Sequence, residues 1–390
     1  MRIKFFLLLV VTVAGFALAV MVPFNHRVGE PLPPEAFLGQ AKRDWFDAAA
    51  EPDAPEKPST AAVVEAASSS GGKFEPITWN CTGANASNFD CYEKYYAALV
   101  GRESIRAAFD DLRSRYPGDG YARAMCHPLT HVIGREASEK FATPGEAYGY
   151  GDGFCWSGYY HGVLEGIIGR IGLKNLAKDI STICSDIKGR EGYSFNYYNC
   201  VHGLGHGVMA ITEDELFQSL DYCDKLTGNW EQQSCGSGAF MENIIVDGKN
   251  HVTKFLNPAD LLYPCNASPD KYKNTCYLMQ TSYMLKINGR NFKATFDLCS
   301  KVEAPYRDTC YQSLGRDASG QSTSEVGPTK NICLLGNDGE QQSNCVIGAV
   351  KDFISYFHSD VQAKQLCNSF ADPILQEICF STAEAYYRQF

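Results

Sequence analysis

The sequence predicts an all-α protein whose folded part is an α-solenoid of about eight helical hairpins, each closed by a disulfide. The first observation is the cysteine count of 16, which divides into eight successive pairs. The second is a period of about 35 residues: the later cysteines of the pairs, from Cys200 to Cys379, lie 35, 41, 34, 35 and 34 residues apart. The third is that apolar residues recur every three or four positions over residues 214–223, 291–299 and 360–367, which is typical of amphipathic helices. Self-similarity at this length indicates one supersecondary unit per repeat.

The cysteines are expected to pair locally, each earlier cysteine with the next one along the chain. The even count favours disulfides, and the C-x2-C spacing of zinc-thiolate sites is missing from the sequence. We expect one helix to end at the first cysteine of a pair, a polar loop to follow, and the next helix to open at the second cysteine. The expected pairs are Cys81–Cys91, Cys126–Cys155, Cys184–Cys200, Cys223–Cys235, Cys265–Cys276, Cys299–Cys310, Cys333–Cys345 and Cys367–Cys379. So many disulfides require an oxidising, extracytoplasmic compartment: a secretory lumen, a periplasm or the cell surface.

Residues 1–24 are predicted to be a signal-anchor or a signal peptide. Arg2 and Lys4 precede an apolar run over residues 5–24, which is about long enough to cross a bilayer. Residues 17–19 read Ala-Leu-Ala, which resembles a signal-peptidase site, and cleavage there would make the protein secreted. We favour an uncleaved anchor, because the apolar run continues beyond that site. The membrane is then a partner of this segment.

The remainder divides into a stem and a head. Residues 25–76 are rich in Pro, Ala, Glu and Ser and are predicted to be a disordered stem. Residues 77–390 form the cysteine-rich head, with a histidine-bearing half at 77–250 and scaffold repeats at 251–390. Asn80, Asn85 and Asn266 lie in glycosylation sequons, which predict a glycoprotein in a host that modifies its exported chains. The net charge of −10, without a basic cluster, argues against nucleic acid as a partner.

Histidines form the chemically informative pattern of the head. Five of the eight follow closely after a cysteine and at helical spacing: His127 with His131, His202 with His206, and His161 four residues before Glu165. Side chains four apart lie on one face of a helix, one turn above the other, so each of three repeats offers a two-residue chelate. The recurring Gly158, Gly203 and Gly238 would let adjacent helices approach closely. His26, His251 and His358 stand alone and are interpreted as ordinary structural residues.

The sequence predicts a centre for one or two transition metal ions, whose candidate ligands are His127, His131, His161, Glu165, His202 and His206. Either three or four of them hold one ion while the others support it, or all six hold two ions. Imidazole with carboxylate suits zinc, iron or copper, and the sequence does not separate these metals. Glu242 and Glu136 lie near the histidine positions and are the candidate catalytic carboxylates.

Two functions of different class follow from this pattern. A metal-dependent enzyme, oxidative or hydrolytic and acting on an extracytoplasmic substrate, is favoured because the histidines are confined to one half of the head. A storage protein would instead repeat its ligands along the whole array. The alternative is a disulfide-stapled helical-repeat interaction module that binds a peptide, a glycan or an envelope protein, with the histidines in a structural hydrogen-bonded network. No P-loop, nucleophile elbow or haem-attachment motif points to another chemistry.

Overall fold

The computed structural model describes residues 77–388, apart from 152, 246–252, 323–324 and 358. Every regular element of these residues is a helix, which confirms the all-α expectation. The segments expected to be an anchor (1–24) and a stem (25–76) lie outside the described residues, as do His26, His251 and His358. Within the described residues, none of the helices has the length and apolarity needed to cross a bilayer.

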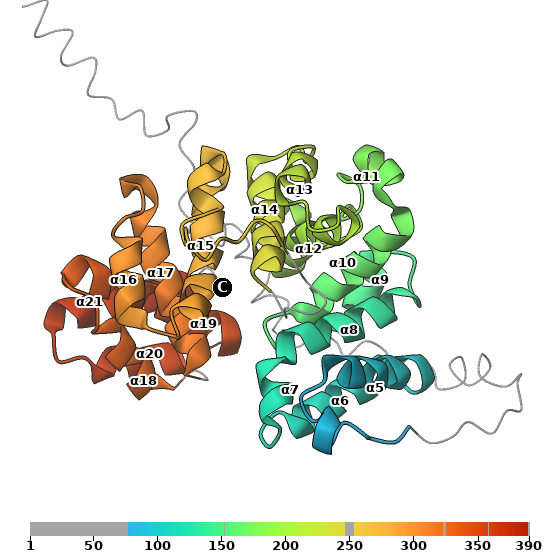
Figure 1. The fold of residues 1–390 in the computed structure, drawn as a ribbon, viewed down its shortest axis with the longest axis horizontal. Helices are drawn as coiled ribbons and strands as arrows, with labels where there is room; N and C mark the ends of the chain where they lie inside the picture. Colours follow the sequence, from blue (N-terminus) through green and yellow to red (C-terminus); the bar gives the residue numbers. More distant parts are fainter. Residues whose placement is uncertain (1–76, 152, 246–252, 323–324, 358, 389–390) are drawn as a thin grey trace, which may run out of the picture. The chain divides into compact units, whose positions relative to one another are not determined.

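Most of the long helices in the N-terminal half are separated by shorter ones (Figure 1). In chain order they are η2 (Gly83–Asn85), α5 (Phe89–Arg102), α6 (Ile105–Arg115), α7 (Gly120–Ala124), α8 (Cys126–Ser138), α9 (Pro144–Tyr148), α10 (Gly158–Ile171), α11 (Leu173–Asp179), η3 (Arg190–Gly192) and α12 (Phe195–Ile211). Local sequence explains several of their starts. Ser104 accepts a hydrogen bond from the amide of Ala107 at the start of α6, and Asp119 accepts two from the first turn of α7.

The same alternation continues to the C-terminus. The elements are α13 (Leu216–Cys223), α14 (Asn229–Ile244), η4 (Cys265–Ala267), α15 (Asp270–Ile287), α16 (Phe292–Cys299), α17 (Ala304–Gln321), α18 (Val326–Cys333), α19 (Gly339–Phe357), α20 (Val361–Ser369) and α21 (Pro373–Tyr387). The amphipathic segments at 214–223, 291–299 and 360–367 are therefore helical, as predicted. Asn291 caps α16 by accepting a hydrogen bond from the amide of Ala294.

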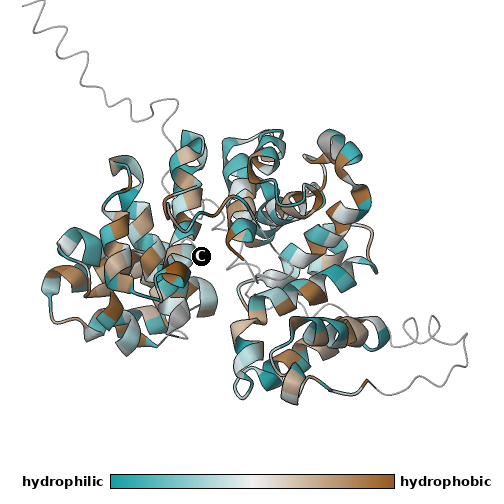
Figure 2. Cartoon of the chain, viewed as in Figure 1, coloured by the Kyte–Doolittle hydropathy of each residue, from teal (hydrophilic) through white to brown (hydrophobic). Residues whose placement is uncertain are grey.

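The longer helices pack against one another in chain order. From α8 onward, α10, α12, α14, α15, α17, α19 and α21 each contact the preceding long helix, and α5 packs against α8. The shorter helices α13, α16, α18 and α20 contact the long helix that follows each of them. Each repeat thus buries its apolar surface against its neighbours, as in a helical repeat array, and brown apolar segments run through these packed helices in Figure 2.

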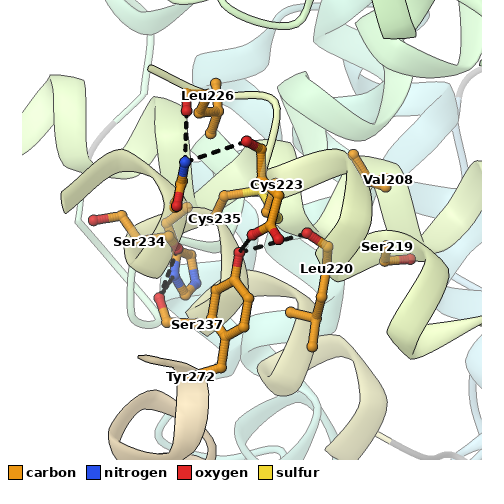
Figure 3. Close-up of a disulfide and its surroundings, with 12 residues drawn as sticks. Val208, Ser219, Leu220, Cys223, Leu226, Ser234, Cys235, Ser237 and Tyr272 are labelled. Atoms are coloured by element: carbon orange, nitrogen blue, oxygen red, sulfur yellow. Dashed lines mark hydrogen bonds between the residues drawn. A yellow bond between two sulfur atoms is a disulfide. The ribbon is translucent and has the colours of Figure 1, made fainter. Parts of the chain in front are cut away.

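All eight expected disulfides are present. One detail of the expected hairpin is wrong in seven of the eight pairs: the second cysteine does not open the long helix but lies inside it, whereas Cys155 lies in the loop before α10. α14 begins at Asn229, before Cys235, and α15 begins at Asp270, within the expected loop and before Cys276. In the pairs that begin at Cys223, Cys299, Cys333 and Cys367, the disulfide joins the last turn of a short helix to the flank of a long one, as Figure 3 shows for Cys223 and Cys235.

Tyrosines fill the spaces between repeats. Tyr272 of α15 is fully buried, and its hydroxyl donates to the carboxylate of Asp224, just beyond α13 (Figure 3). Tyr277 of the same helix donates to Glu303, at the start of α17, over 2.8 Å. An aromatic ring with a polar tip packs between helices and satisfies a polar group at the helix end.

Repeats far apart in sequence also meet. Trp156, in the loop before α10, lies 5.0 Å from Tyr356 of α19 between ring centroids. This contact joins the histidine-bearing half to the C-terminal repeats.

Candidate metal centre

The six predicted ligands come together from three consecutive long helices. α8 carries His127 and His131, α10 carries His161 and Glu165, and α12 carries His202 and His206. Four of the imidazoles are almost completely buried, with at most 5 % of each residue exposed, and His127 is half-buried. Rings on adjacent helices approach to between 4.6 and 5.3 Å, measured between centroids.

Glycines allow the helices to approach this closely. A Cβ on Gly162 of α10 would overlap the carbonyl oxygen of His131 in α8. A Cβ on Gly238 of α14 would overlap the carbonyl oxygen of His202 in α12. Backbone therefore packs on backbone at the same level as the imidazoles, where any larger residue would push the helices apart.

The first histidine pair has a defined orientation. His127 Nδ1 lies 2.8 Å from the carbonyl oxygen of Cys155, and His131 Nδ1 lies 2.5 Å from a carboxylate oxygen of Glu165. A carbonyl and a carboxylate only accept, so both Nδ1 atoms carry the hydrogen. The two Nε2 atoms face each other at 3.0 Å.

The second pair repeats this arrangement. His206 Nδ1 donates to Glu242 over 2.6 Å, and His202 Nδ1 lies 2.7 Å from the hydroxyl of Ser237. Ser237 donates its own hydrogen to the carbonyl of Ser234, so its oxygen accepts from His202. The Nε2 atoms of His202 and His206 face each other at 3.2 Å.

Facing Nε2 atoms without hydrogens place two lone pairs against each other, which is unfavourable unless a cation lies between them. Two nitrogens bound to one ion at about 2.0–2.1 Å lie roughly 3–3.4 Å apart, which matches both pairs. A proton on one of the two Nε2 atoms would also remove the repulsion between the lone pairs. Burial is the main factor that lowers the pKa of His127 and His202, followed by the charge of the neighbouring His131 and His206 respectively, so the uncharged rings of these two residues are favoured.

His161 lies between the two pairs. Its side chain is 2 % exposed, and its Nδ1 has no hydrogen-bond partner within the described structure. Burial and the nearby His206 and His202 lower its pKa well below the ordinary value. Two groups of three histidines that could hold a metal ion include it, one with His127 and His131 and the other with His202 and His206; the ligand atoms of each group lie within 4.8 Å of one another.

The chain matches no protein-family model, no curated protein and no solved structure.

The carboxylates of Glu165 and Glu242 each form a hydrogen bond with a histidine of the cluster. Glu165 also accepts from Arg135 over 2.9 Å; although burial would raise its pKa, contact with His131 and Arg135 holds it well below the usual value. Glu242 joins His131, Glu165 and His206 in a third group of potential ligands. Glu136, on α8, lies in none of the potential ligand groups formed by the described residues, and its catalytic role stays a prediction.

Sequence reasoning missed two partners of the histidines, Ser237 and the carbonyl of Cys155. Ser237 could have been found, because it stands two residues after Cys235 just as His202 stands two residues after Cys200. The carbonyl of Cys155 carries no sequence signal. It belongs to a run of three residues, Cys155 to Ser157, with φ between 55° and 62°, a left-handed conformation that only the surrounding packing can hold.

A cleft of about 1140 Å³ adjoins the histidines. Its lining includes His127 and Trp156 from the histidine-bearing half and Met279, Arg316 and Asp352 from the later repeats. Four cationic side chains line it against two carboxylates, although the whole chain is acidic; these are Arg123, Lys286, Arg290 and Arg316 against Asp317 and Asp352. The half-buried His127 thus connects the buried centre to a substrate-sized cleft.

Asp352, in the lining of this cleft, makes the stability of the folded protein depend on pH. Burial raises the pKa of this carboxyl from 3.8 to about 6, and one of its oxygens has no hydrogen-bond partner within the described structure. Because the pKa of Asp352 is higher in the folded state than in the unfolded state, the uncharged carboxyl favours folding below pH 3.8. This contribution to the free energy of unfolding is lost as the pH rises through about 6. We therefore expect Asp352→Asn to raise the free energy of unfolding by up to roughly 3 kcal/mol near pH 7, and to give little gain near pH 4.

Urea unfolding of the oxidised protein at both pH values measures this difference. Asp110→Asn is the matched control, because its side chain is 61 % exposed, and little change is expected at either pH. An equal gain for Asp352→Asn at the two pH values would show that packing, and not ionisation, is responsible.

Proposed function

We propose that the head is a metal-dependent enzyme of an extracytoplasmic compartment, with its transition metal held by the histidine cluster and its substrate bound in the adjoining cleft. The observation that carries the proposal is the pair of Nε2–Nε2 contacts, at 3.0 and 3.2 Å, between rings whose Nδ1 atoms already have acceptors. In metalloproteins a ligating histidine commonly donates its other ring nitrogen to a carboxylate or carbonyl, which fixes its orientation. Three of the four paired rings make such a bond here, and Ser237 supplies the fourth acceptor.

The cleft favours catalysis over storage. A storage protein gains from many equivalent sites along the array, whereas the described histidines form one cluster. That cluster is buried except at His127, which lines the cleft. A bound zinc, iron or copper ion would supply Lewis-acid activation of water or binding of dioxygen. The excess of cationic side chains in the lining favours a substrate that carries negative charge.

Two roles are assigned to the chain's carboxylates in this proposal. Glu165 and Glu242 orient His131 and His206 through Nδ1, which leaves Nε2 available for the metal. Glu242 is 17 % exposed, against 9 % for Glu165, and is therefore the better candidate to exchange a proton with a substrate. Glu136 is the second candidate for this proton exchange, on the basis of the sequence alone.

Elemental analysis of the full-length protein, produced with its disulfides formed and exposed in turn to Zn²⁺, Fe²⁺ and Cu²⁺, tests the metal centre. We expect near-stoichiometric binding of at least one metal after dialysis. The double variant His131→Ala/His206→Ala removes one ligand from each pair and should lose the metal, while His358→Ala, a histidine that is not among the six predicted ligands, should retain it. A protein that stays metal-free with an unchanged circular dichroism spectrum would contradict the proposal and leave the interaction module as the better function.

An open coordination position separates an enzyme from a passive binder. Azide or cyanide added to the copper- or iron-loaded protein should change its absorption spectrum, because an exogenous ligand enters that position. An unchanged spectrum would indicate a saturated site and count against catalysis.

A further inference from the structure

The positions of the histidines also bear on the number of ions in the proposed metal centre and on the ligand that these ions share. We propose that the cluster holds two metal ions and that His161 bridges them, one ion with His127 and His131 and the other with His202 and His206. This inference rests on the proposed function, since it assumes that the cluster binds metal. It specifies an imidazolate-bridged dinuclear centre.

The position of His161 supports the bridge. Its ring centroid lies 5.3 Å from those of His127 and His131, and 4.7 and 4.6 Å from those of His202 and His206. Rings that share one ion have centroids roughly 5 Å apart, given metal–nitrogen bonds of about 2.0–2.1 Å. His161 thus lies at ligand distance from both pairs, and it is the one residue that both three-histidine groups contain.

The missing partner of His161 supports it further. Each of the other four imidazoles has an oxygen acceptor at Nδ1, namely Cys155, Glu165, Ser237 or Glu242. His161 Nδ1 is buried and lacks one. A buried ring nitrogen without a hydrogen bond is costly, whereas a ring that gives one nitrogen to each of two ions has no need of an acceptor.

The arrangement around His161 is also duplicated. α8 and α12 each contribute an i, i+4 histidine pair, and the next long helix in each case, α10 or α14, supplies the glutamate that accepts from the second histidine. One ion at a common centre, held by His131, His206, Glu165 and Glu242, is the competing arrangement. It would require both carboxylates to give up their Nδ1–H bonds, and it would leave the facing Nε2 pairs unexplained.

Formation of the bridge has a defined proton balance. His161 starts as a neutral imidazole with one N–H; when its second nitrogen binds a metal ion, that N–H bond breaks and the proton leaves to solvent. The resulting imidazolate and the carboxylates of Glu165 and Glu242 carry negative charge around the two cations. Glu165 is partly offset by Arg135, at 2.9 Å.

Copper(II) is the probe for this proposal, because two copper ions joined by an imidazolate couple their spins antiferromagnetically. We expect the full-length oxidised protein to bind two Cu²⁺ per chain by elemental analysis, yet to lose most of its copper electron paramagnetic resonance intensity at low temperature. His202→Ala should bind one Cu²⁺ and show full intensity for that ion. His127→Ala should do the same at the other site and serves if the first variant does not fold.

Each other outcome has a separate meaning. Two Cu²⁺ per chain with full, uncoupled intensity would overturn the bridge. One Cu²⁺ per chain in the unmodified protein would overturn the dinuclear centre while leaving the proposed function intact. Failure to bind copper, zinc or iron would overturn both.

Discussion

Gly162→Ala is expected to destabilise the head by about 1–3 kcal/mol or more and to lower its metal content. The new methyl group would overlap the carbonyl oxygen of His131, which belongs to the backbone of α8 and has no rotamer to adopt instead. The helices α8 and α10 must then separate, which carries His161 away from the first histidine pair. Denaturant unfolding and elemental analysis of the same preparation measure both effects.

Gly169→Ala is the matched control. Gly169 lies on the same helix, is exposed, and would place its methyl group in open space. Alanine should stabilise the helix there by roughly 0.5–1 kcal/mol and leave metal content unchanged. If the two variants behaved alike, close helix packing would not be what assembles the histidines.

Glu165→Gln is expected to have the second large effect. The side chain is 9 % exposed, accepts from His131 Nδ1 and forms an ion pair with Arg135. Glutamine keeps the shape but removes the charge, so Arg135 loses its buried partner and His131 becomes a weaker ligand. We expect metal affinity to fall by roughly 10–100-fold, as when other supporting groups of metal sites are lost, measured by competition with a chromophoric chelator.

Glu242→Gln tests the same bond at the other pair, between Glu242 and His206 Nδ1. It should weaken metal binding with a smaller loss of stability, because this side chain is more exposed. Glu139→Gln, a surface residue 63 % exposed near the end of α8, should change neither property. Unaltered affinity in both Glu165→Gln and Glu242→Gln would mean that the carboxylates do not orient the ligands.

Much of the fold could be predicted from the cysteines. Their order and spacing favoured the eight local pairs that the structure contains, and the amphipathic segments before Cys223, Cys299 and Cys367 identified three of the short helices. The start of the long helices was wrong because a disulfide needs only a Cα–Cα distance, 5.6 Å for Cys223 and Cys235, and two packed helix flanks satisfy it as well as a turn does. The contact of Trp156 with Tyr356 spans 200 positions and has no local signal.

The histidine pairs of the candidate site could be predicted from the sequence, but their assembly into one cluster could not. An i, i+4 spacing places His127 with His131 and His202 with His206 on any helix, whatever its neighbours. Whether the three helices turn these faces toward one another depends on their relative rotation, which glycines such as Gly162 and Gly238 permit but do not determine. The shared position of His161 is a property of that packing, so sequence spacing alone left one and two ions equally open.

X-ray absorption at the metal edge of the loaded, oxidised protein tests the central claim most directly. We predict a first shell of nitrogen or oxygen at about 2.0–2.1 Å, with the outer-shell scattering that imidazole rings produce. His131→Ala/His206→Ala should remove that signal. A first shell of sulfur at about 2.3 Å, or one without imidazole scattering, would contradict a histidine-built metal centre.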